Sequence, residues 1–146
     1  MKALVGPGNG ALESAAGALL DELGPPPGRE IWISSGALDR SRERALARAA
    51  LFGGWAVLRE PGDRVEASTF LWARPTLAAG SVSELEALLD ESAASAPRWR
   101  RAPWLRRRLR RLRALVATGG DAATLPARLE RIGSTARVLS FPGSGW

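Results

Sequence analysis

The apolar positions of the chain recur at two spacings, which predict alternating helices and strands. Between residues 12 and 23 they follow the helical spacing, and a glycine and three prolines then end the helix. Glu30–Ser34 and Trp55–Arg59 are short apolar runs typical of buried strands. A helix is expected between them, from about Asp39 to Phe52. This alternation favours right-handed βαβ units and a mostly parallel sheet.

The second half of the chain continues the pattern less regularly. Ala67–Ala73 is predicted as a strand, and Ser83–Glu86 has the Ser-x-x-Glu form that begins a helix. Leu125–Ile132 is expected to form a short helix and Ala136–Phe141 a last strand. We therefore expect a three-layer α/β fold, Rossmann-like or RecA-like, with a basic, helical C-terminal third. A length of 146 residues suits a single domain spanning residues 1–146.

Charge changes this picture because it is divided unevenly along the chain. Residues 1–97 carry 9 basic and 13 acidic side chains, a net charge of −4. Residues 98–146 carry 12 arginines and 2 acids, a net charge of +10, and 9 of those arginines lie between residues 98 and 113. Such asymmetry predicts an acidic partner for the basic part.

The basic part is predicted to be an arginine-rich amphipathic helix over residues 98–118. Leu105, Leu109, Leu112 and Val116 would form a narrow apolar stripe, with guanidinium groups on the opposite side. Arginines four positions apart repel each other, and an anionic partner would remove that penalty. The residues expected to contact a polyanion are Arg98, Arg100, Arg101, Arg106, Arg107, Arg110, Arg111, Arg113, Trp99 and Trp104.

Several partners fit this segment. Guanidinium groups suit phosphate, so nucleic acid would be held mainly through its backbone, and the two tryptophans would either stack on bases or anchor the helix in the core. An acidic protein surface, or the acidic residues 84–91 of the chain itself, is the alternative. The apolar stripe is too narrow for a membrane-surface helix, so no membrane partner is expected. Membership of a larger assembly stays open.

A glycine-rich motif near the N-terminus is the candidate cofactor site. Gly6-Pro7-Gly8-Asn9-Gly10-Ala11 fits G-x-G-x-x-A between a predicted strand at residues 3–5 and the first helix, which is typical of the phosphate-binding turn of dinucleotide-binding proteins. Gly6, Gly8 and Gly10 also resemble the G-x-G-x-G loop of the class I methyltransferases, which implies S-adenosylmethionine as the ligand. However, the second predicted strand ends in two serines where a ribose-binding acid is usual, and Pro7 lacks an N–H. The motif therefore favours a structural turn, and no cofactor is expected.

The composition argues against most catalytic schemes. There is no Cys or His, which excludes a thiol nucleophile, an imidazole base and the common zinc sites. No Ser–carboxylate pair has supporting spacing, so neither a catalytic residue nor a metal site is predicted. The acids and serines nearest the expected strand ends are Asp39, Glu43, Glu60, Asp63, Glu66, Ser34, Ser35 and Ser41. We expect a cytoplasmic, non-catalytic accessory or adaptor protein that contacts nucleic acid or a nucleoprotein assembly through the arginine-rich segment. The alternatives are a small Rossmann-like, methyltransferase-like cofactor-binding domain and a structural subunit that docks on an acidic protein.

Four stretches together resemble the SulA/ImuA-like group. They are Gly17–Gly24, Arg29–Ile33, Leu38–Arg42 and Phe70–Pro75. That group consists of degenerate RecA-fold proteins of the bacterial damage response, and the resemblance implies action through protein contacts without a working nucleotide loop. The arginine-rich segment departs from the group's pattern.

A second resemblance is to the class I methyltransferases. Ala45–Pro61 is similar to their helix, Gly-Gly turn and following strand. This resemblance implies a Rossmann-like fold and S-adenosylmethionine as cofactor.

Overall fold

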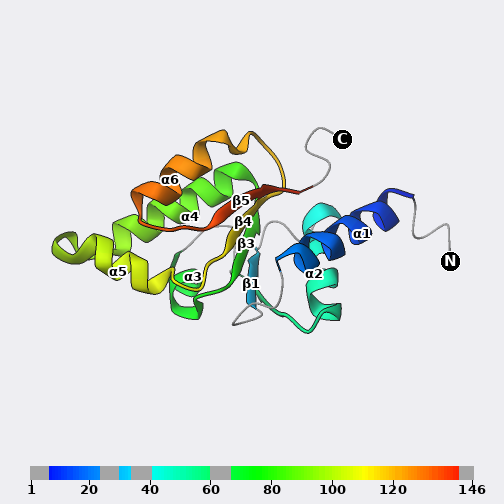
Figure 1. Cartoon of the computed structure of the whole chain (residues 1–146), viewed down its shortest axis with the longest axis horizontal. Helices are drawn as coiled ribbons and strands as arrows, with labels where there is room; N and C mark the ends of the chain where they lie inside the picture. The colour runs from blue at the N-terminus through cyan, green and yellow to red at the C-terminus, as the bar shows by residue number, and fades with distance from the viewer. Residues whose placement is uncertain (1–6, 24–29, 34–40, 60–66, 142–146) are drawn as a thin grey trace.

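A computed structural model describes residues 7–23, 30–33, 41–59 and 67–141 as one layered α/β arrangement (Figure 1). The five strands are β1 (Glu30–Ile33), β2 (Ala56–Arg59), β3 (Leu77–Gly80), β4 (Ala114–Ala117) and β5 (Arg137–Ser140). The six α-helices of the described residues are α1 (Pro7–Glu22), α2 (Ser41–Phe52), α3 (Ala67–Ala73), α4 (Val82–Ser95), α5 (Arg101–Arg108) and α6 (Leu125–Arg131). Two 3-10 turns, η3 (Arg98–Arg100) and η4 (Ala122–Thr124), precede α5 and α6.

All five strands are parallel, in the order β2-β1-β3-β4-β5. This is one of the common doubly wound orders. The chain adds β2 on one side of β1 and then β3, β4 and β5 on the other side, so the strand order switches between β1 and β3. The fold is therefore a Rossmann-like three-layer α/β fold, as the sequence predicts.

The central strands are short and buried on both faces, so their side chains divide between two cores. Trp32, Ala78 and Leu115 lie side by side in register and face the core shared with α3, α4, α5 and α6. The alternate positions face α1 and α2 and include Ile31, Ile33, Leu77, Ala79, Ala114 and Val116. Figure 1 shows the two helical layers on opposite sides of the sheet. Burial on both faces explains why the strands read as continuous apolar runs.

Two predicted elements are wrong. Ala67–Ala73 is helix α3 rather than a strand, because Ala67, Phe70 and Leu71 are buried at helical spacing. The predicted helix over 98–118 ends at Arg108, and β4 follows. The C-terminal third is consequently mixed rather than helical, although its predicted short helix and last strand are confirmed as α6 and β5.

The fourth helix begins two residues earlier than predicted. Ser81 is its N-cap: the backbone N–H of Glu84 donates to the Ser81 hydroxyl at 3.3 Å, and the N–H of Ser81 donates to the Glu84 carboxylate at 2.9 Å. This capping box satisfies two otherwise unpaired helix donors. It also fixes where the chain turns from β3 into α4.

Among the helices that the structure describes, none combines the length and the apolar character that crossing a bilayer requires.

Candidate functional site

The arginine-rich segment is held to the molecule by three buried leucines. Leu105 in α5, followed by Leu109 and Leu112, packs into the core beside α4 and α6. The helix stops because the backbone is drawn into the sheet: the N–H of Arg113 donates to the carbonyl of Thr76 and its carbonyl accepts from Arg137, both at 2.8 Å. Val116, expected on the same apolar stripe, consequently lies in β4 and faces the opposite core.

The arginine side chains of this segment stay in solvent. All those predicted to contact a polyanion are exposed, and Arg108 is half-buried. Within the described residues, none of the nine arginines between 98 and 113 forms an ion pair with a carboxylate. Two of them lie against tryptophans instead: the guanidinium carbon of Arg100 is 5.2 Å from the Trp99 ring centroid, and that of Arg108 is 5.1 Å from the Trp104 centroid. The positive charge of the segment is therefore uncompensated by the described part of the chain.

The two tryptophans have different roles. Trp104 is partly buried and packs against the core, so it anchors α5 to the rest of the molecule. Trp99 is 81% exposed, with Arg100 beside its ring. Of these two tryptophans, Trp99 is the one whose exposed ring offers a surface on which a base can stack.

The acidic side of α4 is occupied by another helix. Glu86 and Asp90 both pair with Arg128 of α6, and Glu84 belongs to the capping box. The hydrogen bond to Asp90 raises the pKa of Arg128 above its ordinary value against the opposing effect of burial, and the charges of Asp90 and Glu86 also raise it. These carboxylates are thus not paired with the arginines of residues 98–113, the internal partner that the sequence left open.

Arg74, from a distant part of the sequence, lies beside arginines of the 98–113 segment. Arg74 follows α3 and has a positive φ of 51°, which is uncommon for a residue with a side chain. Together with Arg107, Arg110 and Arg111 it lines a cavity of about 740 Å³, which we call the arginine cavity. Sequence reasoning missed Arg74, since no pattern in the chain predicts its left-handed backbone.

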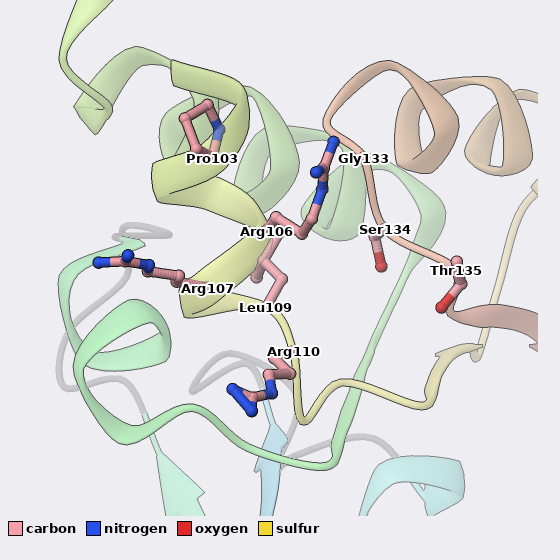
Figure 2. Close-up of a pocket in the computed structure, with 8 residues that line it drawn as sticks. All are labelled: Pro103, Arg106, Arg107, Leu109, Arg110, Gly133, Ser134 and Thr135. Atoms are coloured by element: carbon pink, nitrogen blue, oxygen red, sulfur yellow. The ribbon is translucent and has the colours of Figure 1, made fainter. Parts of the chain in front are cut away.

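A second cavity, of about 550 Å³, lies between α5 and the loop that follows α6 (Figure 2). We call it the loop cavity, and its lining residues are Pro103, Arg106, Arg107, Leu109, Arg110, Gly133, Ser134 and Thr135. Figure 2 shows Arg106 directed toward Gly133, while Arg107 and Arg110 leave α5 and the turn after it in other directions. Ser134 and Thr135 lie in the loop between α6 and β5, and no pattern in the chain predicts their place in this cavity.

The structure brings together only part of the predicted site. Arg106, Arg107, Arg110 and Arg111 line one or both cavities. The remaining predicted residues, Arg98, Trp99, Arg100, Arg101, Trp104 and Arg113, line neither. Both cavities are formed by segments that lead into β3, β4 and β5, so they lie at the amino-end edge of the sheet. Doubly wound proteins usually bind ligands at the opposite edge.

The glycine motif does not form the expected loop. Helix α1 begins at Pro7, so Gly8 and Gly10 belong to the helix, whereas Gly6 and the predicted strand at residues 3–5 lie outside the described residues. A ligand role for Gly6, Gly8 and Gly10 stays a prediction. Of the acids and serines considered for catalysis, Glu43 is buried in α2 and Ser41 is exposed at its start. The others, Ser34, Ser35, Asp39, Glu60, Asp63 and Glu66, lie outside the described residues.

Comparison with known proteins defines the class of fold. No family model matches the chain, and no curated protein sequence matches it. Among solved structures it is similar to the crystal structure of CmiS6, with a TM-score of 0.56 and 18% sequence identity over 88% of this chain. The matched region is 29% of CmiS6, so this chain spans less than a third of that protein's length. A likeness at this identity supports the Rossmann-like fold alone, and neither resemblance noted in the sequence gains a matching family.

Proposed function

We propose that this protein is a non-catalytic accessory protein that contacts nucleic acid through the phosphate backbone. The surface that carries the proposal consists of the exposed arginines of residues 98–113 together with Arg74. Its decisive property is that none of these arginines pairs with a carboxylate in the described part of the chain.

The physical argument starts from repulsion. Arg107, Arg110, Arg111 and Arg74 line one cavity, so four positive charges share it. Like charges this close destabilise the segment, and an anion with regularly spaced charges reverses the sign of the interaction. Guanidinium groups form paired hydrogen bonds with phosphate oxygens, and releasing counterions from the nucleic acid adds to the affinity.

Nucleic acid is favoured over an acidic protein by Trp99. Its ring is exposed amid the arginines, and an exposed aromatic ring among cations is the arrangement used by proteins that bind unpaired bases. Nucleic acid supplies both parts of this arrangement, phosphates for the arginines and flat base faces for the ring.

The test compares two variants with the same net charge. Arg106→Gln/Arg110→Gln removes two charges from the proposed surface, and Arg44→Gln/Arg48→Gln removes two from α2, on the other side of the sheet (Figure 1). Fluorescence anisotropy with a labelled oligonucleotide should show ~10-fold or greater weakening for the first variant only. Equal weakening by both variants, or no binding by the unaltered protein at low salt, contradicts the proposal.

A competition arm separates nucleic acid from acidic protein. Poly-glutamate of matched charge is added to the preformed protein–oligonucleotide complex. The proposal predicts that unlabelled oligonucleotide displaces the probe at a much lower concentration than poly-glutamate does. Equal displacement would favour docking on an acidic protein surface.

A further inference from the structure

The arginine cavity and the loop cavity meet at shared side chains. Arg107 and Arg110 line both, so the two cavities adjoin across these residues. Their volumes, about 740 Å³ and about 550 Å³, each lie in the range of small-molecule sites. The two cavities are therefore neighbours beside α5 and the turn that follows it.

The arginine cavity favours an anion with more than one negative charge. Four guanidinium groups line it, and no carboxylate of the described residues is among them. A phosphodiester of a nucleic-acid backbone carries one negative charge, whereas a terminal phosphate monoester carries about 1.5 to 2 near neutral pH. The strained backbone of Arg74 supports a ligand role, since such conformations concentrate at binding sites.

The loop cavity is more mixed, because apolar and hydroxyl side chains line it beside Arg106, Arg107 and Arg110. Pro103 and Leu109 supply apolar atoms, and Ser134 and Thr135 supply hydroxyl groups (Figure 2). The hydroxyl oxygen of Ser134 accepts from the backbone N–H of Ala136 at 3.2 Å, which leaves its proton available to donate to a ligand. A flat group with apolar faces and polar edges fits these walls.

We propose that the two cavities together bind one nucleotide bearing a terminal phosphate. The phosphate lies among Arg74, Arg107, Arg110 and Arg111, and the base and sugar lie against Pro103, Leu109 and the two hydroxyls. When the bound nucleotide is the end of a nucleic-acid strand, this site is part of the proposed nucleic-acid surface, and the inference then rests on the proposed function. The same chemistry is also presented by a free nucleotide.

The experiment uses the full chain and three otherwise identical single-stranded oligonucleotides, phosphorylated at the 5′ end, at the 3′ end or at neither. We expect a ~10-fold preference for one phosphorylated strand over the unphosphorylated strand. Arg74→Asn should abolish that preference, since asparagine tolerates the left-handed backbone but carries no charge. Arg74→Lys, which keeps the charge, should retain part of it, and Arg44→Gln should leave it unchanged.

The possible outcomes separate the two proposals. If the unaltered protein binds all three strands equally, the nucleotide site is wrong and the backbone surface stands. If it binds no strand but calorimetry detects AMP or ATP, the proposed function fails and the site takes free nucleotides. Binding neither strands nor nucleotides overturns both. Should Arg74→Asn not fold by circular dichroism, Arg111→Gln in the same cavity replaces it, and an unchanged phosphate preference in that variant overturns the inference.

Discussion

The Nε of Arg128 on α6 lies 3.3 Å from Oε2 of Glu86 on α4, and Arg128 also donates to Asp90 one turn further along α4. This clamp joins two helices that pack on the same face of the sheet. It also pairs two of the acids of α4 with an arginine from outside residues 98–113. The arginines of α5 are thereby left to face solvent.

Removing the clamp should weaken the fold without weakening nucleic-acid binding. Arg128→Gln is expected to lower the melting temperature modestly at low salt, with the difference shrinking as salt screens the pair. The pKa of Arg128 is raised in the folded protein, so the charged side chain stabilises the fold. This contribution to the free energy of unfolding is fully present below the ordinary arginine pKa and is lost only as the pH rises through the higher pKa of the folded protein. The effect should therefore be constant from about pH 6 to about pH 10. Thermal melts at several pH values check this, and a steep change within that range would contradict it.

A glycine after β4 is predicted to be essential for stability. Gly120 has a φ of 96°, and a Cβ there would lie 3.1 Å from the Cβ of Val82 at the start of α4. Gly120→Ala should cost about 1–3 kcal/mol of unfolding free energy. The neighbouring Gly119→Ala is the control, because a Cβ there meets nothing within 4 Å. Urea unfolding measures both, and equal losses would refute the steric account.

Leu105 is predicted to be the main anchor of α5. It is only 1% exposed, so Leu105→Ala should cost about 2–5 kcal/mol. Leu51 on α2 is 62% exposed, and Leu51→Ala should change stability by less than about 0.5 kcal/mol. A small loss for Leu105→Ala in chemical denaturation would mean that α5 is not held by the core.

Trp99 is predicted to distinguish single-stranded from duplex nucleic acid. Trp99→Ala should weaken binding of a single strand by ~10-fold, with less than a ~2-fold effect on duplex, because only unpaired bases can stack on its ring. Phe52→Ala, which removes a 92% exposed ring on the other side of the sheet, is the control. Equal effects of Trp99→Ala on both forms would show that the ring does not stack on bases.

Much of the fold could be predicted from the sequence because its elements carry local signals. A Gly-Gly pair follows α2 and precedes β2, and the helical spacing of residues 12–23 ends within one residue of the end of α1 at Glu22. Strand β3 was missed because Leu77–Gly80 is rich in alanine and glycine, which have low strand propensity. It forms a strand because it is central and buried on both faces, a tertiary property.

The candidate site was only partly predictable for a similar reason. The arginines of residues 106–111 are visible as a run of charge, but helical periodicity continued through Val116 and concealed the change from helix to strand. Arg74 and the 134–135 hydroxyls are brought to the run by the parallel order of β3, β4 and β5. That proximity depends on sheet topology, which no local pattern specifies.

Salt dependence tests the central claim most directly. If the arginine surface neutralises about six phosphates of a duplex, the logarithm of the binding constant should fall with the logarithm of salt concentration with a slope near −5. Arg106→Gln/Arg110→Gln should make that slope shallower by about 2, whereas Arg44→Gln/Arg48→Gln should leave it unchanged. A slope near zero for the unaltered protein, or the same slope in the Arg106→Gln/Arg110→Gln variant, would contradict phosphate contact by this surface.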